Sequence, residues 1–447
     1  MKKVITYGTY DLLHHGHIKL LQRAKALGDY LIVGVTADTF DRSRGKINVQ
    51  QSLIERINNV RDTGLADEIV VEEYIGQKID DIRRLNVDVF TVGSDWKGKF
   101  DYLKEFCEVV YLDRTEGISS SELRCEQRDI RIGLVGDSAI LNKFENESHY
   151  VNGVTISGVC TNNGSLLAER LHQLPCVTDQ LDELLNVSDA IYVISKPEMH
   201  YEHIYRALGK GKHVLCETPI TIKVEQWCEL QQMAKDKGLV LADGLKTAYS
   251  MAYDRLCLLA KSGAIGKVVS VDATCTSLQD MERMREGNGP CPWNSICAWG
   301  PTALLPIFQL LGTDYISKQI VTHLLDEELF FDAFTKVSFV YPHAVASLKV
   351  GQGVKSEGEL VVSGTKGYIY VPAPWWKTDY FEVRYENPAE NKRYFYQLDG
   401  EGIRYEILSF IKSIKSSRNE SYIDVNTSEA IIRVIQDFYE GRDVIRM

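Results

Sequence analysis

A strand-like run opens the chain and leads directly into Tyr7-Gly8-Thr9-Tyr10-Asp11-Leu12-Leu13-His14-His15-Gly16-His17. The run, residues 2–6, is rich in β-branched residues, and apolar residues recur at helical spacing in residues 18–28, after the quoted segment. The pattern predicts a strand, a tight turn and the start of a helix. His14 and His17 flank Gly16 at that start, where unpaired backbone N–H groups and the helix dipole favour a bound phosphate.

Two histidines at such a helix start suit nucleotidyl transfer. Their rings can donate hydrogen bonds to the α- and β-phosphate oxygens as negative charge builds on these oxygens in the transition state. Gly16 carries no side chain, so an anion can come close to the backbone. The H-x-G-H spacing alone is equally well explained by a surface histidine cluster or an accidental metal site.

Two later segments make the pattern more specific. They are Gly93-Ser94-Asp95-Trp96-Lys97-Gly98-Lys99-Phe100-Asp101 and Arg114-Thr115-Glu116-Gly117-Ile118-Ser119-Ser120. With the histidine segment, they resemble the signature of the glycerol-3-phosphate cytidylyltransferase family over residues 1–125, with Ser94 in place of one family acid. The resemblance implies an α/β fold, a Rossmann-like HxGH nucleotidyltransferase domain. It also implies that this domain couples an alditol phosphate to CTP by direct displacement, assisted by Mg²⁺.

The same resemblance assigns roles to individual residues of the first half. It implies catalytic roles for His14, His17, Lys46 and Arg114. It implies that the nucleotide is bound by Thr9, Tyr10, Asp11, Gly16, Arg56, Gly93, Asp95, Trp96, Thr115, Gly117, Ile118, Ser119 and Ser120. Asp11 is also the predicted metal residue, holding Mg²⁺ or orienting His14, although a turn-capping role for Asp11 is an equally good interpretation.

Several of these positions can also be interpreted without a ligand. Lys46 by itself would more often be a solvated loop charge. Ser119 and Glu122 have the S-x-x-E form of a capping box, which by itself only marks a helix start, whereas the resemblance implies that this start holds the departing phosphates beside Arg114. The family usually carries an arginine where this chain has Gly64, which suggests an acceptor other than glycerol 3-phosphate.

Length and composition predict a globular protein of two or three domains. The chain has 447 residues, of which 44% are apolar and 25% charged. Its net charge of −11 argues against a nucleic-acid or anionic-membrane partner, and no apolar run approaches the length of a transmembrane or secretory segment. The ten cysteines form no C-x-x-C pair and no zinc spacing with the ten histidines, which is typical of free thiols in a cytoplasmic protein.

Short apolar runs separated by helical stretches continue through the first half, at residues 30–35, 68–71, 87–92 and 108–112. This alternation predicts a parallel sheet that binds ligands at the carboxyl ends of its strands. A second such pattern begins at residues 130–138, which resemble the opening of a dinucleotide-binding fold, with Ser138 where a second close-approach glycine is expected.

Two further segments, residues 190–200 and 211–220, resemble the glucose-fructose oxidoreductase and inositol dehydrogenase family. The resemblance, over residues 130–447, implies a dinucleotide-binding Rossmann domain followed by an α+β domain with an open sheet, whose strands we expect from about 329 to 397. We therefore expect a cytidylyltransferase domain at 1–127, an NAD(P)-binding domain at 128–245 and an α+β oxidoreductase domain at 246–447. The resemblances of both halves imply a homodimer or larger homo-oligomer.

This second resemblance implies a set of cofactor-binding residues. They are Gly133, Gly136, Ser138, Thr161, Asn162, Pro197, His200, Glu217 and Thr218. Thr161 and Asn162 stand where an acid usually contacts the adenosine ribose, so the sequence favours NADP over NAD.

The departures from this family concern its proton donors. Thr218 replaces the family's catalytic lysine, and its later Asp, His and Asp become Ala298, Thr302 and Leu305. Because reduction of a carbonyl needs an acid for the new alkoxide, Lys246 is the candidate donor, with Tyr249 and His200 as alternatives. A solvated loop lysine is the competing interpretation of Lys246.

Three hypotheses follow for function. In the first, the second half reduces a ketose phosphate and the first half couples the resulting alditol phosphate to CTP, giving a CDP-alditol for a capsule or a teichoic-acid-like polymer. In the second, the oxidoreductase-like half is a silent module for oligomerisation or substrate binding, and only cytidylyl transfer remains. In the third, the H-x-G-H segment belongs to an adenylyltransferase. The segments at 93–101 and 114–120 argue against this third hypothesis.

Overall fold

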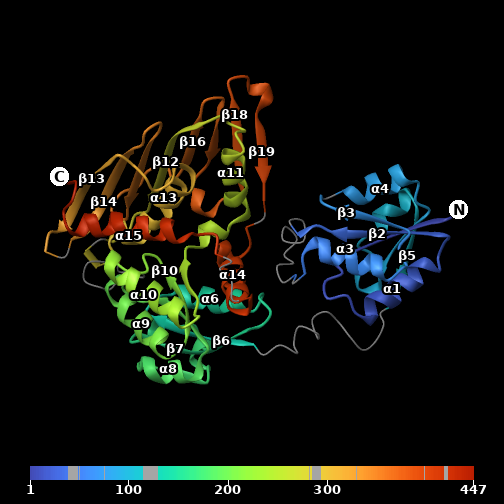
Figure 1. Cartoon of the computed structure of the whole chain (residues 1–447), viewed down its shortest axis with the longest axis horizontal. Helices are drawn as coiled ribbons and strands as arrows, with labels where there is room; N and C mark the ends of the chain where they lie inside the picture. Colours follow the sequence, from blue (N-terminus) through green and yellow to red (C-terminus); the bar gives the residue numbers. More distant parts are fainter. Residues whose placement is uncertain are drawn as a thin grey trace. The chain divides into compact units, whose positions relative to one another are not determined.

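The computed structural model describes residues 1–38, 49, 51–74, 76–113, 129–280, 282–283, 293–328, 330–396, 398–416 and 421–447. The chain divides into two compact units, Met1–Asp129 and Ile130–Met447, and each is described by itself (Figure 1). We call them unit 1 and unit 2.

Unit 1 is built on a five-stranded parallel sheet in the order β3-β2-β1-β4-β5. Its elements, with η for a 3₁₀ turn, are β1 (Lys3–Gly8), α1 (His15–Lys25), β2 (Tyr30–Thr36), α3 (Leu53–Asp62), β3 (Glu68–Glu72), α4 (Gln77–Leu85), β4 (Val89–Gly93), η1 (Ser94–Trp96), η2 (Asp101–Glu105) and β5 (Glu108–Leu112). The apolar runs predicted as strands therefore form β2 to β5. They are continuous runs because each central strand is covered on both faces.

Neighbouring side chains of each strand point to opposite faces of the sheet, so unit 1 has two cores. Val4 of β1 packs with Leu21 of α1 and Val60 of α3 on one face. Ile5 of β1 packs with Ile82 of α4 on the other. Figure 1 shows α1 and α3 on one side of the sheet and α4 on the other.

Unit 2 begins with a six-stranded parallel sheet in the order β11-β10-β9-β6-β7-β8. Its elements are β6 (Ile130–Gly136), α6 (Ile140–Ser148), β7 (Val154–Cys160), η3 (Gly164–Leu166), α7 (Glu169–His172), β8 (Cys176–Thr178), α8 (Leu181–Val187), β9 (Ala190–Ile194), α9 (Pro197–Gly209), β10 (His213–Glu217), α10 (Val224–Asp236) and β11 (Leu241–Gly244). The order and direction of these strands are those of a Rossmann-like fold, as the sequence predicted.

The rest of unit 2 forms a nine-stranded mixed sheet in the order β19-β18-β17-β16-β12-β15-β14-β13-β20. Its elements are η4 (Lys246–Tyr249), α11 (Met251–Lys261), β12 (Val268–Thr276), α13 (Ser295–Leu311), β13 (Ser317–Asp326), β14 (Phe331–Val340), β15 (Val345–Gly351), β16 (Leu360–Gly364), β17 (Gly367–Val371), η5 (Trp375–Lys377), β18 (Tyr380–Tyr385), η6 (Pro388–Glu390), β19 (Lys392–Phe395), η7 (Asp399–Gly402), α14 (Ile403–Ser416), α15 (Val425–Tyr439) and β20 (Val444–Arg446).

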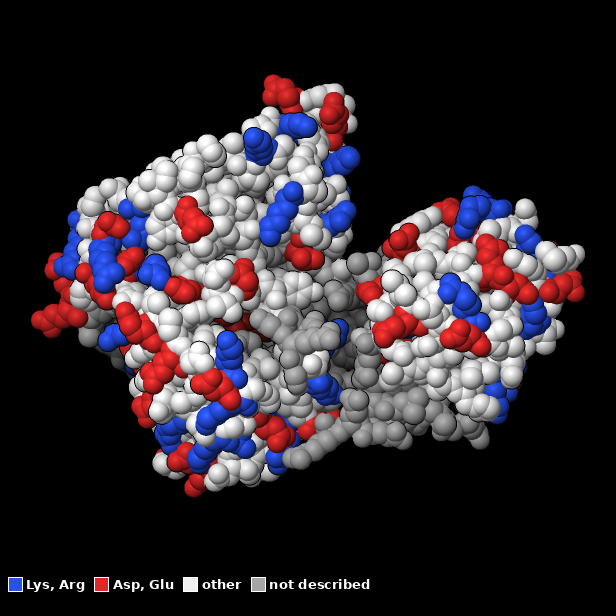
Figure 2. Space-filling model, in the orientation of Figure 1, with Lys and Arg blue, Asp and Glu red and all other residues white. Residues whose placement is uncertain are grey.

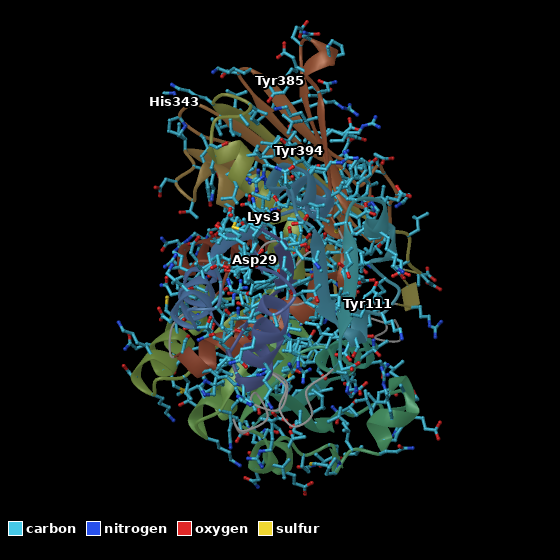
Figure 3. All side chains as sticks on the ribbon, turned by 90° about the vertical axis from the view of Figure 1, so that its right-hand side faces the viewer. Lys3, Asp29, Tyr111, His343, Tyr385 and Tyr394 are labelled. Carbon is cyan, nitrogen blue, oxygen red and sulfur yellow. The ribbon has the colours of Figure 1, made fainter. Side chains whose placement is uncertain are left out.

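The open sheet is confirmed, but it is wider than residues 329–397. Strand β12 lies between β15 and β16, although it comes before them in the chain, and β13 and β20 lie at one edge. Such pairings join residues far apart in sequence, so the local pattern around 329–397 carries no sign of them. His343 lies in the turn between β14 and β15, and Tyr385 and Tyr394 lie on β18 and β19 (Figure 3).

The surface in Figure 2 shows acidic and basic side chains intermixed on this face of each unit. None of the helices in the described part of the chain has the length and apolar character needed to cross a bilayer. Among the same residues, no group of three His, Cys, Asp or Glu side chains is placed to hold a metal ion.

Candidate functional site

The predicted site residues of unit 1 gather at the edge of the sheet where strands β1 and β4 end. These neighbouring parallel strands are paired from Val4 with Val89 to Thr6 with Thr91, and the chain continues outward in opposite directions from them, to β2 and to β5. Such a point, where the strand order reverses, leaves a crevice outside the carboxyl ends of the strands in which ligands bind. The segments after Gly8 and after Gly93 both lie there.

His14 and His17 are held against each other at this edge. His14 is the N-cap of α1, and its Nδ1 accepts a hydrogen bond from the backbone N–H of Gly16 at 3.1 Å. Because Nδ1 is an acceptor, the neutral ring carries its proton on Nε2 and can donate from that side. The ring stacks on His17 with centroids 3.9 Å apart, and Tyr10 meets His17 edge-on at 5.5 Å.

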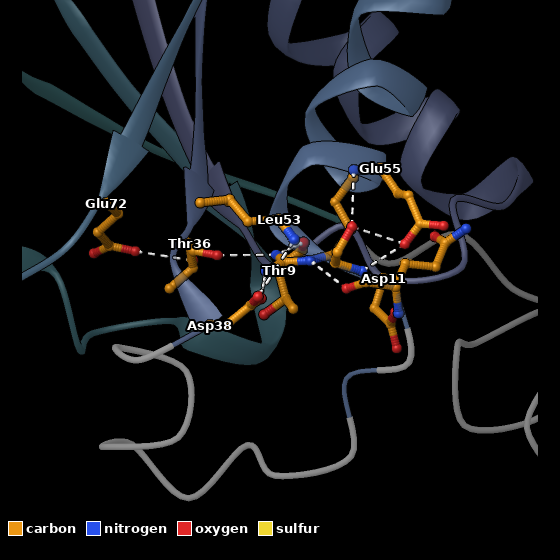
Figure 4. Close-up of polar contacts among 10 residues, drawn as sticks. Thr9, Asp11, Thr36, Asp38, Leu53, Glu55 and Glu72 are labelled. Atoms are coloured by element: carbon orange, nitrogen blue, oxygen red, sulfur yellow. Dashed lines mark hydrogen bonds and ion pairs between the residues drawn. The ribbon is translucent and has the colours of Figure 1, made fainter. Parts of the chain in front are cut away.

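The turn between β1 and α1 is fixed by a buried carboxylate. Asp11 is 3% exposed, and its Oδ1 accepts a hydrogen bond from the backbone N–H of Gln51 at 3.0 Å (Figure 4). Gln51 Oε1 in turn accepts a hydrogen bond from the backbone N–H of Leu12 at 2.9 Å. These bonds tie the turn to the segment before α3. The predicted contact of Asp11 with Mg²⁺ stays a prediction, and one carboxylate beside a triphosphate is a usual magnesium arrangement.

Arg56 of α3 is completely buried and joins the ends of two strands. Its Nη1 donates to the carbonyl oxygens of Thr9 at 2.6 Å and Thr36 at 2.9 Å, and its Nε donates to that of Gln51 at 3.1 Å. Its Nη2 pairs with Asp38, which lies with Thr9 and Thr36 in Figure 4. Arg56 therefore positions the loops of the crevice, and its predicted contact with the nucleotide stays a prediction.

A second buried polar group, which no sequence pattern indicated, lies at the ends of β2 and β3. Glu72 accepts a hydrogen bond from Thr36 Oγ1 at 3.0 Å and pairs with Lys78 of α4, whose ammonium lies 4.6 Å from the centre of the Tyr7 ring. The Tyr7 hydroxyl donates to Asp81 at 2.8 Å, and burial and this carboxylate raise the pKa of Tyr7. Only Tyr7 lies in a quoted motif.

The remaining predicted residues of unit 1 fall into two groups. Gly93 ends β4, and Asp95 and Trp96 follow in η1; Trp96 is 38% exposed, and the ammonium of Lys99 lies 5.2 Å from its ring centre. The others lie outside the described residues, namely Lys46, Arg114, Thr115, Gly117, Ile118, Ser119, Ser120 and the capping-box residue Glu122.

In unit 2, β6 ends at a glycine that packs closely on the backbone of the neighbouring strand β9. Gly136 has a φ of 138°, and a Cβ there would lie 2.5 Å from the carbonyl oxygen of Ile194. Ser138 is buried, and its Oγ accepts from the N–H of Ile140 at 3.3 Å, at the start of α6. Gly133, earlier on β6, packs closely on Ser188. The start of α6 after this strand fits the diphosphate of a dinucleotide.

The residues after β7 already hold an anion. The Oδ1 of Asp137 accepts hydrogen bonds from Thr161 Oγ1 at 2.6 Å and from the N–H groups of Asn162 at 2.8 Å and Asn163 at 3.1 Å. A 2′-phosphate on the adenosine ribose would compete with this carboxylate for the same donors. The preference for NADP over NAD that Thr161 and Asn162 suggested stays a prediction.

Several residues predicted for the cofactor site of unit 2 lie where β9 and β10 end. Pro197 begins α9, and Thr218, which is buried, follows Glu217 after β10. The Tyr192 hydroxyl donates to Glu217 Oε1 at 2.5 Å. Burial raises the pKa of Glu217, although that hydrogen bond and the Lys246 charge oppose the rise. Pro197 and Thr218 are buried and Glu217 is half-buried, and all three lie at the carboxyl edge of the sheet.

The three candidate proton donors differ in access. The ring nitrogens of His200 lie 2.8 Å from the carbonyl oxygens of Pro219 and Ser195, and the side chain is completely buried. Tyr249 is 5% exposed and lies 3.1 Å from Ser421 Oγ. Lys246 is 24% exposed and pairs with Glu401 at 3.2 Å. Lys246 is thus the most accessible of the three.

The buried His200 makes a testable contribution to stability. Burial lowers its pKa to about 4 in the folded protein, against about 6.5 for an exposed histidine, although the carbonyl oxygens of Pro219 and Ser195 oppose the shift. Between these values the unfolded chain binds the proton first, so falling pH removes up to about 3 kcal/mol of stability from unit 2. Burial raises the pKa of Asp243 and that of Asp332 to about 6. These two groups therefore add stability to the folded protein as the pH falls over about pH 6–4, which is opposite to the effect of His200.

The measurement is therefore a difference between variants. The unfolding free energy of unit 2 is followed from pH 7 to 4 for the parent, for His200→Gln and for His343→Gln, an exposed control. We expect the decrease in unfolding free energy between pH 7 and pH 4 to be smaller by about 3 kcal/mol in His200→Gln than in the parent, and equal to that of the parent in His343→Gln. Equal pH profiles in all three proteins would show that His200 is not held neutral.

The positions of the missing family acids lie on α13. Ala298, Thr302 and Leu305 are one turn apart along this helix, which packs against β12, β14 and β15. None of the three can donate a proton as a carboxylic acid or an imidazolium does.

Comparison with known proteins relates the two halves to different families. Residues 5–126 match the model of a cytidylyltransferase-like family. Residues 130–245 match that of an oxidoreductase family with an NAD-binding Rossmann fold.

Curated relatives of the first half are similar over almost their whole length. A glycerol-3-phosphate cytidylyltransferase of Bacillus spizizenii is 52% identical over 124 residues, which are 28% of this chain and 95% of that protein. Another, of Staphylococcus aureus, is 48% identical over 131 residues and also covered to 95%. A dTDP-3,4-didehydro-2,6-dideoxy-alpha-D-glucose 3-reductase of Streptomyces violaceoruber is 36% identical over 88 residues, but these are only 20% of this chain and 26% of that protein.

Solved structures are similar to the second half in fold. A 3-ketoreductase from Actinomadura kijaniata, in complex with NADP and TDP-benzene, superposes with a TM-score of 0.61 at 16% identity, covering 72% of this chain and all of that one. A UDP-N-acetylglucosamine 3-dehydrogenase from Acidithiobacillus ferrooxidans gives 0.58 at 17% identity, with 71% and 99% covered.

Proposed function

Because the chain belongs to the cytidylyltransferase-like family through residues 5–126, we propose that unit 1 couples an alditol phosphate to CTP and releases pyrophosphate. The observation that carries the proposal is the stacked pair of His14 and His17 at the first turn of α1, at the point where the strand order reverses. The 48–52% identity to glycerol-3-phosphate cytidylyltransferases supports it.

In the proposed reaction, a phosphate oxygen of the alditol phosphate attacks the α-phosphorus of CTP. The bond from that phosphorus to the oxygen bridging the α- and β-phosphates breaks, and pyrophosphate leaves. His14, through Nε2–H, and His17 donate hydrogen bonds to the phosphate oxygens as charge builds there. Asp11 would hold Mg²⁺, which neutralises charge on the triphosphate, and Lys46 and Arg114 would add positive charge.

For unit 2 we propose reduction of the matching ketose phosphate, whose product is the nucleophile of unit 1. The nicotinamide cofactor, when bound, supplies the hydride to the carbonyl carbon. The start of α6 would hold its diphosphate, and Lys246 would protonate the new alkoxide. The oxidoreductase-family match at 130–245 and the layout of the sheet support this step.

The proposal extends to the setting of the enzyme. Its substrates, CTP and a phosphorylated sugar, are small cytoplasmic molecules, and the CDP-alditol would serve capsule or teichoic-acid-like polymer synthesis. We propose a homodimer or larger assembly.

A second candidate is favoured by the residues at the family's proton-donor positions. With Thr218, Ala298, Thr302 and Leu305 there, unit 2 would be a silent module for oligomerisation or substrate binding, and cytidylyl transfer would be the sole activity.

One coupled assay separates the two candidates. Pyrophosphate release from CTP and Mg²⁺ is measured with dihydroxyacetone, ribulose or fructose phosphate, with and without NADH or NADPH, and with the matching alditol phosphates. We expect a ketose phosphate to release pyrophosphate only when the reduced cofactor is present and consumed. Release from preformed alditol phosphates alone, with no cofactor oxidised, would instead establish the silent module; turnover with ATP in place of CTP would contradict the proposal for unit 1.

A further inference from the structure

Three lysines from distant parts of unit 2 surround one carboxylate. Glu401 Oε1 lies 3.2 Å from Nζ of Lys143 and 2.9 Å from Nζ of Lys377, and Glu401 Oε2 lies 3.2 Å from Nζ of Lys246. Lys143 is on α6, Lys246 begins η4, Lys377 ends η5 and Glu401 is in η7. We call these four residues the Glu401 cluster.

The turn that presents Glu401 is shaped to do so. Glu401 has a left-handed backbone, with φ 54° and ψ 20°, and lies between Gly400 and Gly402, which also have positive φ. A Cβ at Gly402 would lie 2.6 Å from the carbonyl oxygen of Lys246, and one at Gly400 would overlap the carboxylate of Glu147. The turn is therefore packed tightly on η4 and α6, and it holds Glu401 in a conformation that residues with a side chain rarely adopt.

The cluster carries more positive than negative charge and is open to solvent. Three ammonium groups and one carboxylate leave a net charge of +2, in a chain whose net charge is −11. The side chains of Lys143, Lys377 and Glu401 are 54%, 35% and 31% exposed, so a ligand can reach them. Burial alone would raise the pKa of Glu401, but Lys377 and Lys246 outweigh it and lower that pKa to about 2.

Glu217 and Glu406 lie close enough to Lys246 to interact with its charge. Burial raises the pKa of Glu217, and burial together with the Glu217 charge raises that of Glu406, whereas the Lys246 charge opposes both shifts. The acid that forms an ion pair with Lys246 in the described part of unit 2 is Glu401.

The Glu401 cluster lies at the edge of the sheet where ligands bind in folds of this kind. Lys143 is in the first turns of the helix that follows the Gly136 turn, and Lys246 follows β11, so both lie at the carboxyl edge of the parallel sheet. We propose that the Glu401 cluster binds the phosphate monoester of the substrate of unit 2. A phosphate monoester carries about −1.5 to −2 charges at neutral pH, which matches the surplus of the cluster.

This inference rests on the proposed reduction of a ketose phosphate and adds a recognition site to it. Lys246 would contact both the phosphate and, as its proton donor, the reacting end of the same short substrate. The test therefore leaves Lys246 unchanged and uses Lys143 and Lys377, to which no step of the reaction is assigned.

Binding to the full chain is measured by calorimetry without turnover. The probes are inorganic phosphate, ribulose 5-phosphate, ribulose, CDP and NADH, and the variants are Lys143→Met, Lys377→Met, Glu401→Gln and the exposed control Lys392→Met on β19. We expect Lys143→Met and Lys377→Met each to weaken ribulose 5-phosphate about tenfold, and Glu401→Gln to strengthen it, because a competing carboxylate is lost. Ribulose, CDP and NADH should bind all variants alike, and Lys392→Met should behave as the parent.

Each contrary result overturns the proposal in a recognisable way. Unchanged affinity for ribulose 5-phosphate in both lysine variants, or weaker binding in Glu401→Gln, would show that no phosphate occupies the cluster. Loss of NADH or CDP affinity instead would assign the cluster to a cofactor or nucleotide diphosphate. Phosphate bound in unit 1 is unaffected by these substitutions, so the difference from the parent reports the cluster alone. If the lysine dependence is found but no cofactor is ever oxidised, the site stands and the proposed reductase function fails.

Discussion

Replacing His17 with alanine is expected to lower the rate of pyrophosphate release from CTP by about a thousandfold. The ring of His17 stacks on His14 at the first turn of α1, which follows the carboxyl end of β1. Loss of a preorganised donor to a transition-state oxygen costs about 10²–10³ in rate, and the variant also loses the surface that holds His14 in place. Turnover with saturating CTP and alditol phosphate is the measurement.

His17 is a better target than His14, because His14 also caps the helix through Gly16. The matched control is His15→Ala, which removes the same type of side chain from an exposed position of the same helical turn. We expect His15→Ala to keep parental activity and both variants to keep the parental circular dichroism spectrum. A His17→Ala protein with parental turnover would remove the H-x-G-H segment from the proposed mechanism.

Replacing Arg56 with alanine is expected to destabilise unit 1 by about 3–5 kcal/mol. The guanidinium is completely buried and donates to the carbonyl oxygens of Thr9, Thr36 and Gln51, so its loss removes three buried hydrogen bonds and leaves a cavity. Because the chain has two units, we expect one unit to open before the other. Hydrogen exchange resolved along the sequence therefore measures the effect, and the amides of β1 and β2 should exchange faster.

The control for this variant is Arg61→Ala, on the same helix. Arg61 is exposed and its Nη1 bonds to Asn58, so its loss should change stability by less than about 0.5 kcal/mol. Arg56→Lys should fall between the two, since an ammonium keeps the charge but cannot donate to three carbonyl oxygens in the geometry of a guanidinium. Parental exchange rates in β1 and β2 of Arg56→Ala would show that Arg56 does not hold this edge together.

Local sequence was enough to predict the sheet of unit 1, whereas the sheet of unit 2 was expected from a family resemblance. Parallel strands that are buried on both faces are continuous apolar runs, and the runs at 30–35, 68–71, 87–92 and 108–112 became β2 to β5. The start of α1 was also predictable, because a helix start depends on a few neighbouring residues. His14 caps this helix two residues before Gly16. The assignments of individual site residues stay predictions, and those at 114–120 lie outside the described residues.

Pairings between distant residues could not be predicted in this way. Thr161 and the N–H group of Asn162 donate to Asp137, more than twenty residues earlier, and no local pattern around residue 161 indicated this contact. The width of the mixed sheet was underestimated because β12 is inserted between β15 and β16.

The sequence by itself determined which segments form helices and strands, the order of the two units and the position of the histidine pair. These features follow from hydrophobic periodicity and from residues within one helical turn of each other. Only the tertiary structure decided that Arg56 is a buried tie between two strands and that Lys143, Lys246 and Lys377 meet at Glu401. Ion pairs and buried hydrogen bonds depend on distance and on exclusion of water, and both are set by how the strands and helices pack rather than by spacing along the chain.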